Sequence, residues 1–235
     1  MISINQTELI KLSDPNDIWD YLLGKADIHF FWLGRQSYRP IWDLQKDIHF
    51  KRVNKEIPDV VLFVEHEHVY TFGKNSDTNN LLDSKPRGAD VIQIDRGGEV
   101  TYHGPGQLVC YPIIDLHNYK KSVSWYMRML EDIVIDTLKS YGIHSGQKEG
   151  LTGVWVADEK ICAMGIRLAR WVTMHGFAIN LNPNMIYFDG IIPCGIFEYG
   201  VSSMHAQGVN IDMILLSEKI ISSFTNLFLR GDNEV

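Results

Sequence analysis

A glycine-rich segment, Arg96–Gln107 with the sequence RGGEVTYHGPGQ, constrains the fold of this chain more than any other feature. It holds four glycines and a proline and lies between two apolar runs, 91–95 and 108–116. Glycine reaches backbone conformations that other residues disfavour, so such a loop can aim its N–H groups at a ligand. Arg96 adds a cation, and His103 adds a ring whose unperturbed form titrates near neutral pH. The segment therefore predicts a loop between two strands that grips a ligand.

The size and charge of the chain exclude several classes of protein. Its 235 residues, 45% of them apolar, suit one domain with a large core. The net charge of −7 and the lack of a dense Lys/Arg run argue against nucleic-acid binding. No apolar run reaches the roughly 18–20 residues of a membrane span, and MISINQTELIKL at the N-terminus is unlike a signal peptide. We expect a single catalytic domain over residues 1–235, cytoplasmic, with no nucleic-acid or membrane partner.

The cysteines and histidines give no metal signal. Cys110, Cys162 and Cys194 are too few and too scattered for a disulfide framework, and none forms a C-x-x-C pair. His66 and His68 form an H-x-H pair, but no third ligand stands at a recognisable spacing. We therefore expect no metal. Cys110 and Cys162 lie in apolar runs, which favours the role of small buried hydrophobes for both.

Periodicity predicts alternating strands and helices along the chain. We expect helices over 14–26, 37–55, 122–141 and 210–229, with Asn210 as an N-cap of the last. We expect strands over 60–65, 91–95, 108–116, 153–157, 160–169 and 171–181. Pro112 places the 108–116 strand near a sheet edge or a bulge. Asp158 and Glu159 leave room only for a hairpin turn, so the later strands form an antiparallel meander. These elements predict an α+β fold with a mixed, largely antiparallel sheet flanked by helices.

Cys194 differs from the other two cysteines. It stands between Pro193 and Gly195 in a long irregular loop, 182–200, rather than in an apolar run. A cysteine becomes a nucleophile when a nearby cation or helix terminus favours its thiolate. Lys160, which opens a strand after a tight turn, and His103 are the candidate cation and base. The plain alternative for Lys160 is an exposed hairpin lysine.

Four motifs together resemble one known family. RGGEVTYHGPGQLVCYPIIDL closely resembles the signature of the octanoyltransferases, the lipoyl(octanoyl) transferases of lipoic-acid synthesis. GVWVADEKICAMGIR resembles the strand pair that carries the family's lysine, VTMHGFAINLNPN the strand that follows, and FDGIIPCGI the cysteine loop. FVEHEHVYTFGK is similar to the segment upstream of the signature. The resemblance extends from about Pro58 to Met204, with the motifs in the family's order.

The resemblance implies an acyltransferase with the fold of the biotin and lipoate protein ligases. Such enzymes take an octanoyl group from octanoyl-acyl carrier protein and hold it as a cysteine thioester. They then pass it to a lysine of a lipoyl domain as an amide. The implied acceptors are the lipoyl domains of 2-oxoacid dehydrogenase complexes and the glycine cleavage H protein. Amide formation from a thioester is downhill, so no cofactor is implied.

The site residues are carried over position by position. The family's cysteine and lysine fall on Cys194 and Lys160 as the catalytic pair. The implied substrate-binding residues are Arg96, Gly97, Gly98, Glu99, Val100, Thr101, Tyr102, His103, Ala163, Met164, Gly165, Gly176, Phe177 and Ala178. His103 either forms a hydrogen bond within its loop or orients the acceptor.

The chain departs from the family pattern at two places, and two other functions fit the fold. Glu67 and His68 replace a Pro-Pro pair, and Cys162 stands where alanine is usual. In a regular strand Cys162 would share the face of Lys160 and lie near the site as a second thiol. The alternative functions are an ATP-dependent lipoate or biotin protein ligase and a non-catalytic acyl-binding protein.

Overall fold

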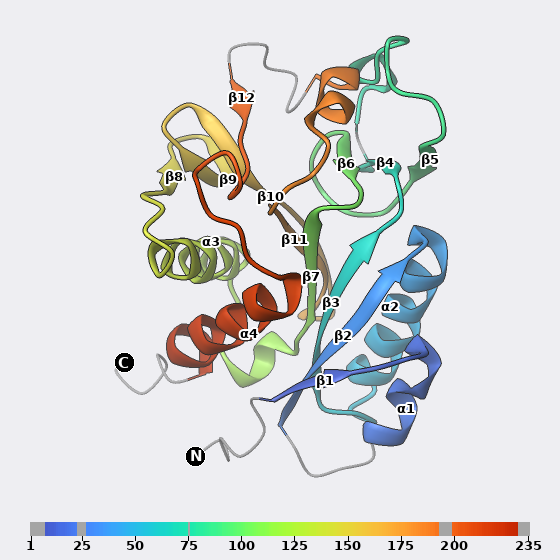
Figure 1. The fold of residues 1–235 in the computed structure, drawn as a ribbon. Coiled ribbons are helices and arrows are strands. Elements are labelled where there is room, and N and C mark those ends of the chain that lie inside the picture. Colours follow the sequence, from blue (N-terminus) through green and yellow to red (C-terminus); the bar gives the residue numbers. More distant parts are fainter. Residues whose placement is uncertain (1–7, 23–26, 75, 193–198, 230–235) are drawn as a thin grey trace.

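The computed structural model describes residues 8–22, 27–74, 76–192 and 199–229. Within these ranges a nine-stranded sheet has the order β1-β2-β3-β7-β11-β10-β9-β8, with β12 paired to β10 (Figure 1). The strands β1–β3 pair in parallel, and each neighbouring pair from β3 to β8 is antiparallel. The strands are β1 (Leu9–Lys11), β2 (Ile28–Gln36), β3 (Asp59–His66), β7 (Gln107–Ile113), β8 (Gly146–Lys148), β9 (Leu151–Val156), β10 (Glu159–Ala169), β11 (Val172–Asn180) and β12 (Gly200–Val201). The predicted mixed, largely antiparallel sheet is confirmed.

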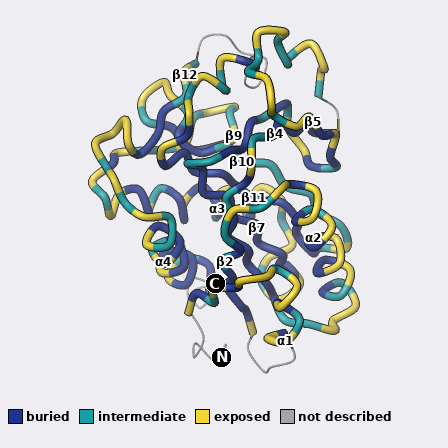
Figure 2. The backbone as a smooth tube through the Cα atoms, turned by 45° about the vertical axis from the view of Figure 1, so that its right-hand side comes forward, coloured by how far each residue is buried: buried dark blue, intermediate teal, exposed yellow. Residues whose placement is uncertain are grey.

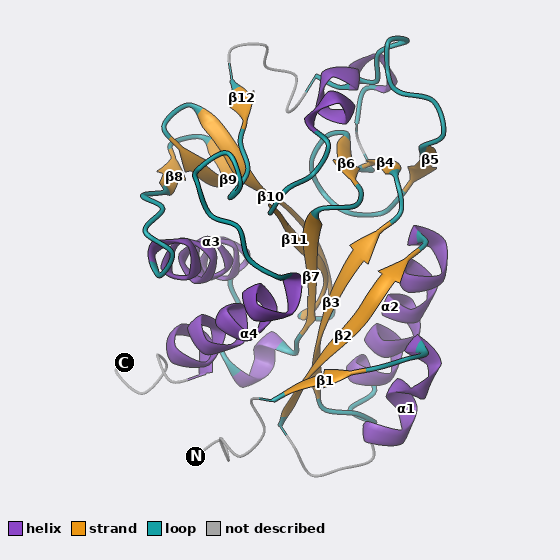
Figure 3. Cartoon of the chain, viewed as in Figure 1, coloured by secondary structure: helices purple, strands orange, loops and turns teal. Residues whose placement is uncertain are grey.

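Helices cover both faces of this sheet (Figure 3). The helices are α1 (Ile18–Tyr21), α2 (Tyr38–Val53), α3 (Val123–Lys139) and α4 (Met213–Phe224). On β3, Val60, Leu62 and Val64 pack toward α2, whereas Val61 and Phe63 pack into the cluster that holds the side chains of α3 and α4. Strand side chains alternate between faces, so a run as apolar as VVLFV is buried on both sides. Figure 2 shows the resulting buried layer at the centre of the molecule.

A second, three-stranded sheet lies at one end of the main sheet (Figure 1). It consists of β4 (Val69–Phe72), β5 (Asp90–Gln93) and β6 (Thr101–His103), in the order β5-β4-β6. The glycine-rich segment connects β5 to β6 and continues into β7. A Cβ on Gly73 would lie 1.9 Å from the carbonyl oxygen of Gly98, so glycine alone allows this close approach.

The predicted helices are confirmed with changes at their ends. Asp14 caps a 3-10 turn, Pro15–Asp17, by accepting a hydrogen bond from the Asn16 N–H, but α1 ends at Tyr21. Ser122 caps α3, and Gly142, at φ +77°, follows its C-terminus, close to the predicted bounds 122–141. The predicted cap Asn210 is wrong, because Asp212 accepts the hydrogen bond from Ile214 N and α4 begins at Met213.

Two turn and edge predictions need correction. Val156 pairs with Glu159, so the hairpin turn is Ala157-Asp158, one residue earlier than expected. Pro112 does not lie at an edge, because β7 is an interior strand between β3 and β11. Its regular pairing with β11 ends at Cys110, and the Thr173 hydroxyl donates to the Pro112 carbonyl beyond that point. The irregular ladder explains how an interior strand accommodates a proline.

In the described parts of the chain, no helix has the length and apolar character needed to cross a membrane.

Gly176 of β11 tests how closely β7 and β11 approach. A Cβ there would lie 2.2 Å from the Cys110 carbonyl oxygen and 2.6 Å from Pro112 Cδ, neither of which can rotate away. We expect Gly176→Ala to lower the free energy of unfolding by about 1–3 kcal/mol in urea titrations. Gly146→Ala on β8, where nothing lies within 4 Å, serves as the control. Equal stability of the two variants would contradict this packing.

Candidate active site

A cavity of about 580 Å³ lies between the glycine-rich segment and the β10–β11 hairpin. This volume is in the range typical of small-molecule sites. Every substrate-binding residue predicted from the sequence lines it except Tyr102, and Lys160 lines it too. Thr101 and His103 face the cavity from β6, and the strand alternation turns Tyr102 to the other side. There Tyr102 is buried and its hydroxyl pairs with His68 Nδ1 at 2.7 Å.

The floor of the cavity is a trough of small residues. Ala163 pairs with Ala178 across β10 and β11, and Gly165 pairs with Gly176. Directly paired residues of antiparallel strands share a face, so two successive levels of the sheet carry a methyl group or no side chain at all. All four residues line the cavity. The helix α2 begins only at Tyr38, which also lines the cavity, so it leaves this part of the sheet face open.

The glycine-rich segment forms the cover of the trough. Gly97 N donates to the carbonyl oxygen of Ile166 at 3.0 Å, so the segment lies along β10. The buried Arg96 guanidinium donates from Nη2 to the Thr71 carbonyl and hydroxyl oxygens, at 2.8 and 3.0 Å, and thereby braces the segment against β4. The Gly97 N–H was a candidate donor to a bound anion. Its hydrogen bond to Ile166 means that it already serves to hold the segment in place.

Asp95 joins the cover to the floor. One of its oxygens lies 3.0 Å from His175 Nε2 on β11, and the other lies 2.9 Å from Arg167 Nη1 on β10. The hydrogen bond with His175 is the main cause that lowers the pKa of the Asp95 carboxyl. The residue directly before Arg96 is thus held to both strands of the hairpin.

A chain of hydrogen bonds with fixed polarity ends at His103. Asn180 Nδ2 donates to the Ser202 carbonyl, and Gln107 Nε2 donates to the Tyr102 carbonyl and to Asn180 Oδ1. Carbonyl oxygens only accept, so both amides have one allowed orientation. Gln107 Oε1 then faces His103 Nδ1 at 2.8 Å, which requires the proton on Nδ1. His103 Nε2 is left with its lone pair.

Burial keeps the histidines of this region neutral. It lowers the pKa of His103 to about 3, and the nearby His66 and Arg96 act in the same direction. It also lowers the pKa of His66 to about 4. The Tyr38 ring is parallel to the His103 ring at 6.1 Å between centroids, and His66 Nε2 pairs with the Tyr111 hydroxyl at 2.8 Å. At neutral pH, His103 thus donates a hydrogen bond through Nδ1, can accept one through Nε2, and is a poor carrier of protons.

Lys160 lies where β10 meets both β9 and β12. Its register partner on β9 is Trp155, and its ammonium lies 4.7 Å from the centroid of that ring. On the other side it pairs in parallel with Val201, and its carbonyl accepts from Ser202 N at 3.0 Å.

Cys194 lies outside the described residues, as do its neighbours in the 193–198 segment. The described chain on both sides of this segment is at the cavity. Ile191 lines the cavity before the segment, and Val201, beside Lys160, lines it after.

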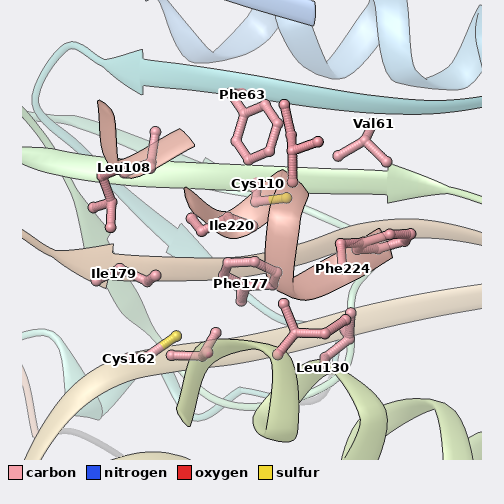
Figure 4. Close-up of a cluster of buried hydrophobic side chains, with 14 of the residues drawn as sticks. Val61, Phe63, Leu108, Cys110, Leu130, Cys162, Phe177, Ile179, Ile220 and Phe224 are labelled. Carbon is pink, nitrogen blue, oxygen red and sulfur yellow. The ribbon is translucent and has the colours of Figure 1, made fainter. Parts of the chain in front are cut away.

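Cys162 does not share the cavity face with Lys160. The pairing of β9 with β10 shifts register between Lys160 and Cys162, so Ile161 and Cys162 both enter the core. Figure 4 shows Cys162 among buried side chains, near Ile179 of β11. Burial raises the pKa of its thiol and also that of Cys110. Both cysteines are buried hydrophobes, as their apolar runs predict, and the idea of a second thiol in the site is wrong.

Several residues of the cavity wall were not predicted from the sequence. The polar ones include Tyr38, Gln107, Tyr111 and His175. The strand alternation from Gln107 through Val109 to Tyr111 could have placed all three on the face of the floor. Tyr38 carried no such signal, because only the packing of α2 brings it there.

In the described ranges no three His, Cys, Asp or Glu side chains gather as metal ligands would.

Comparisons with known proteins show which family this chain belongs to. Residues 37–225 match the family of the lipoyl protein ligase A/B catalytic domain. The chain is 45% identical over 218 residues to an octanoyltransferase of Flavobacterium johnsoniae, covering 83% of this chain and 94% of that one. It is 46% identical over 219 residues to an octanoyltransferase of Christiangramia forsetii, covering 83% of this chain and 93% of that one.

Solved structures share the fold. A putative lipoate protein ligase from T. acidophilum with bound lipoic acid has a TM-score of 0.69 at 12% identity, covering 95% of this chain and 86% of that one. A biotin protein ligase from Aquifex aeolicus has a TM-score of 0.50 at 11% identity, covering 86% of this chain and 70% of that one. At these identities the likeness shows the fold alone, and it confirms the ligase-like architecture.

The low pKa of His103 predicts how stability changes with pH. Below its ordinary value of 6.5 the unfolded ring binds a proton that the folded ring does not. His103 therefore has no effect on the pH dependence of the free energy of unfolding above pH 6.5, and it lowers that free energy as the pH falls toward 3. Between pH 6 and 5, His103→Gln should reduce the slope of unfolding free energy against pH by about 1.4 kcal/mol per pH unit. Urea titrations measure it, with exposed His144→Gln as control. An unchanged slope would mean that the folded ring titrates.

Proposed function

The chain belongs to the octanoyltransferases of the lipoyl protein ligase A/B catalytic-domain family and is an acyltransferase, and from this premise we propose its substrates and its catalytic pair. The donor is octanoyl-acyl carrier protein, and Cys194 holds the octanoyl group as a thioester. The acceptor is the lysine of a lipoyl domain, of a 2-oxoacid dehydrogenase complex or of the glycine cleavage H protein. Lys160 supplies the positive charge and moves protons.

One observation carries this proposal. Lys160, Ile191 and Val201 line the same cavity, and the 193–198 segment with Cys194 lies between the last two in sequence. The residues that the family places around its acyl substrate line that cavity as well. This supports an assignment of nucleophile, cation and acyl site to one place.

In the first step the Cys194 thiolate attacks the carbonyl carbon of the donor thioester. The new C–S bond forms as the bond to the carrier's sulfur breaks, and the departing thiolate takes a proton. A nearby ammonium favours the thiolate form of a cysteine, which is the part we assign to Lys160. Covalent catalysis of this kind divides one transfer between two large proteins into two smaller steps.

In the second step the neutral amine of the acceptor lysine attacks the thioester on Cys194. The C–N bond of the amide forms, the C–S bond breaks, and the amine loses one proton. Lys160, having given its proton to the departing carrier thiolate, accepts this one and returns to the ammonium form. The net reaction converts a thioester and an amine into an amide and a thiol, so it needs no ATP.

The cavity suits an apolar chain of moderate length. Phe188, Ile191 and Leu151 add apolar surface to the trough of small residues. Burying the seven methylene and methyl groups of an octanoyl chain contributes about 5–6 kcal/mol, at roughly 0.8 kcal/mol for each. This energy is sufficient to select a medium-length chain from shorter ones.

The thioester on Cys194 is tested by intact mass. We expect a gain of one octanoyl group after mixing with octanoyl-acyl carrier protein, and its loss when a lipoyl domain is added. Cys194→Ser should form no adduct that a lipoyl domain can discharge, because an ester is less reactive than a thioester, whereas Cys162→Ser should behave as wild type. An unmodified wild-type protein that still transfers octanoate would contradict the intermediate.

The same assay separates the alternative functions. A ligase would use free octanoate with ATP, whereas the proposed transferase gives no octanoyl-lipoyl domain from that mixture. A non-catalytic binding protein would give no adduct with either donor.

The trough predicts the limit on acyl length. Ala163→Val adds two methyl groups at the first level of the floor, opposite Ala178. Loss of room for one or two methylenes should reduce the rate with octanoyl donor about 4- to 15-fold relative to hexanoyl donor. Steady-state kinetics with the two donors measures this ratio. Ala169→Val, the same change at the far end of β10, is the control. An equal loss of rate with both donors would argue that the acyl chain does not lie in this trough.

A further inference from the structure

Two lysine ammonium groups converge on one indole ring next to the cavity. Lys160 Nζ lies 4.7 Å from the centroid of Trp155, and Lys148 Nζ lies 5.3 Å from it. The indole is 5% exposed, so its interaction with a cation is partly shielded from water. Tyr199, the first described residue after the 193–198 segment, packs edge-on against the same ring with 5.4 Å between centroids.

The sheet dictates this arrangement. Trp155 and Lys160 are register partners on β9 and β10, so their side chains leave the same face. Gly153, two residues before Trp155, has no side chain in the path of the lysine. A Cβ there would lie 3.4 Å from Lys160 Cε and 3.5 Å from Cδ. The aliphatic stem of Lys160 therefore lies across Gly153, and its ammonium reaches the indole.

The two lysines have different surroundings. Lys148 forms an ion pair with Asp158 and lies over the Tyr199 ring, 3.8 Å from its centroid. Lys160 is the one that lines the cavity. Trp155 is absent from the described lining of that cavity, so it can act on the site only through the groups packed against it.

We propose that Trp155 is the positioning residue of Lys160. The negative face of its indole holds the ammonium at the cavity wall, in place to stabilise a thiolate. Through Tyr199 the same ring fixes the end of the chain that follows the cysteine segment. This inference rests on the proposed function, in which Lys160 serves Cys194.

Fluorination of Trp155 tests the inference with little change of shape. Trp155 is replaced by tryptophan analogues that carry one, two and three ring fluorines. Each added fluorine weakens the negative potential on the face of the indole. We expect the rate of Cys194 acylation by octanoyl-acyl carrier protein to fall stepwise, to a total of about 5- to 30-fold. The KM for the donor should stay constant, and the midpoint of the pH profile for Cys194 alkylation should move upward. A purely structural role of the ring would produce none of these trends.

The matched control is the same series at Trp42. Lys46 Nζ lies 4.5 Å from that ring, so the pair has the same chemistry on α2, away from Lys160. No change is expected there. Lys160→Met, assayed in parallel, separates the two hypotheses. A flat series at Trp155 with an inactive Lys160→Met overturns the role of Trp155 and leaves the proposed function standing. A fully active Lys160→Met overturns both.

Discussion

The hydrogen bond from Gly97 N to the Ile166 carbonyl, 3.0 Å long, is the contact on which the site depends. It lays the glycine-rich segment along β10 and turns two separate pieces of chain into the cover and the floor of one cavity. The contact requires bare backbone on the strand, because a Cβ on Gly165 would lie 3.0 Å from the Gly97 oxygen. Arg96 and Asp95 then hold the segment from its two sides, one against β4 and the other against the β10–β11 hairpin.

Much of the fold was predictable because its signals are local. The run 60–65 is apolar at every position but the last, and only a strand buried on both faces needs that. The α3 helix was expected over 122–141, and the structure has its cap at Ser122 and a left-handed glycine, Gly142, just after its end. The tight spacing between 157 and 160 predicted the hairpin. Its turn was placed one residue late because Ala157, at φ +49°, gave no sequence sign of a left-handed conformation.

The errors come from long-range contacts. Nothing near Pro112 indicates that β11 stops pairing regularly beside it, and this irregularity allows an interior position. Regular alternation put Cys162 beside Lys160, and a register shift imposed by β9 moved it into the core. Tyr102 is inside the signature motif, yet its side chain supports the cover from behind. The family motifs were sufficient to predict most of the residues around the cavity. The roles of Tyr38 and Asp95 became clear only from the folded structure.

The bare trough has a consequence for how this enzyme's selectivity can drift over evolutionary time. Its two glycine positions are locked: at 176 a side chain would strike the Cys110 carbonyl at 2.2 Å, and at 165 it would press on Arg96. The other level of the trough already carries side chains: Ala163 is partly buried, whereas its partner Ala178 belongs to the core cluster beneath α2. A change of substrate length is therefore expected to arise at position 163, while the glycine level of the trough stays constant. Related enzymes that accept acyl chains of different length should differ at position 163 and keep glycine at 165 and 176.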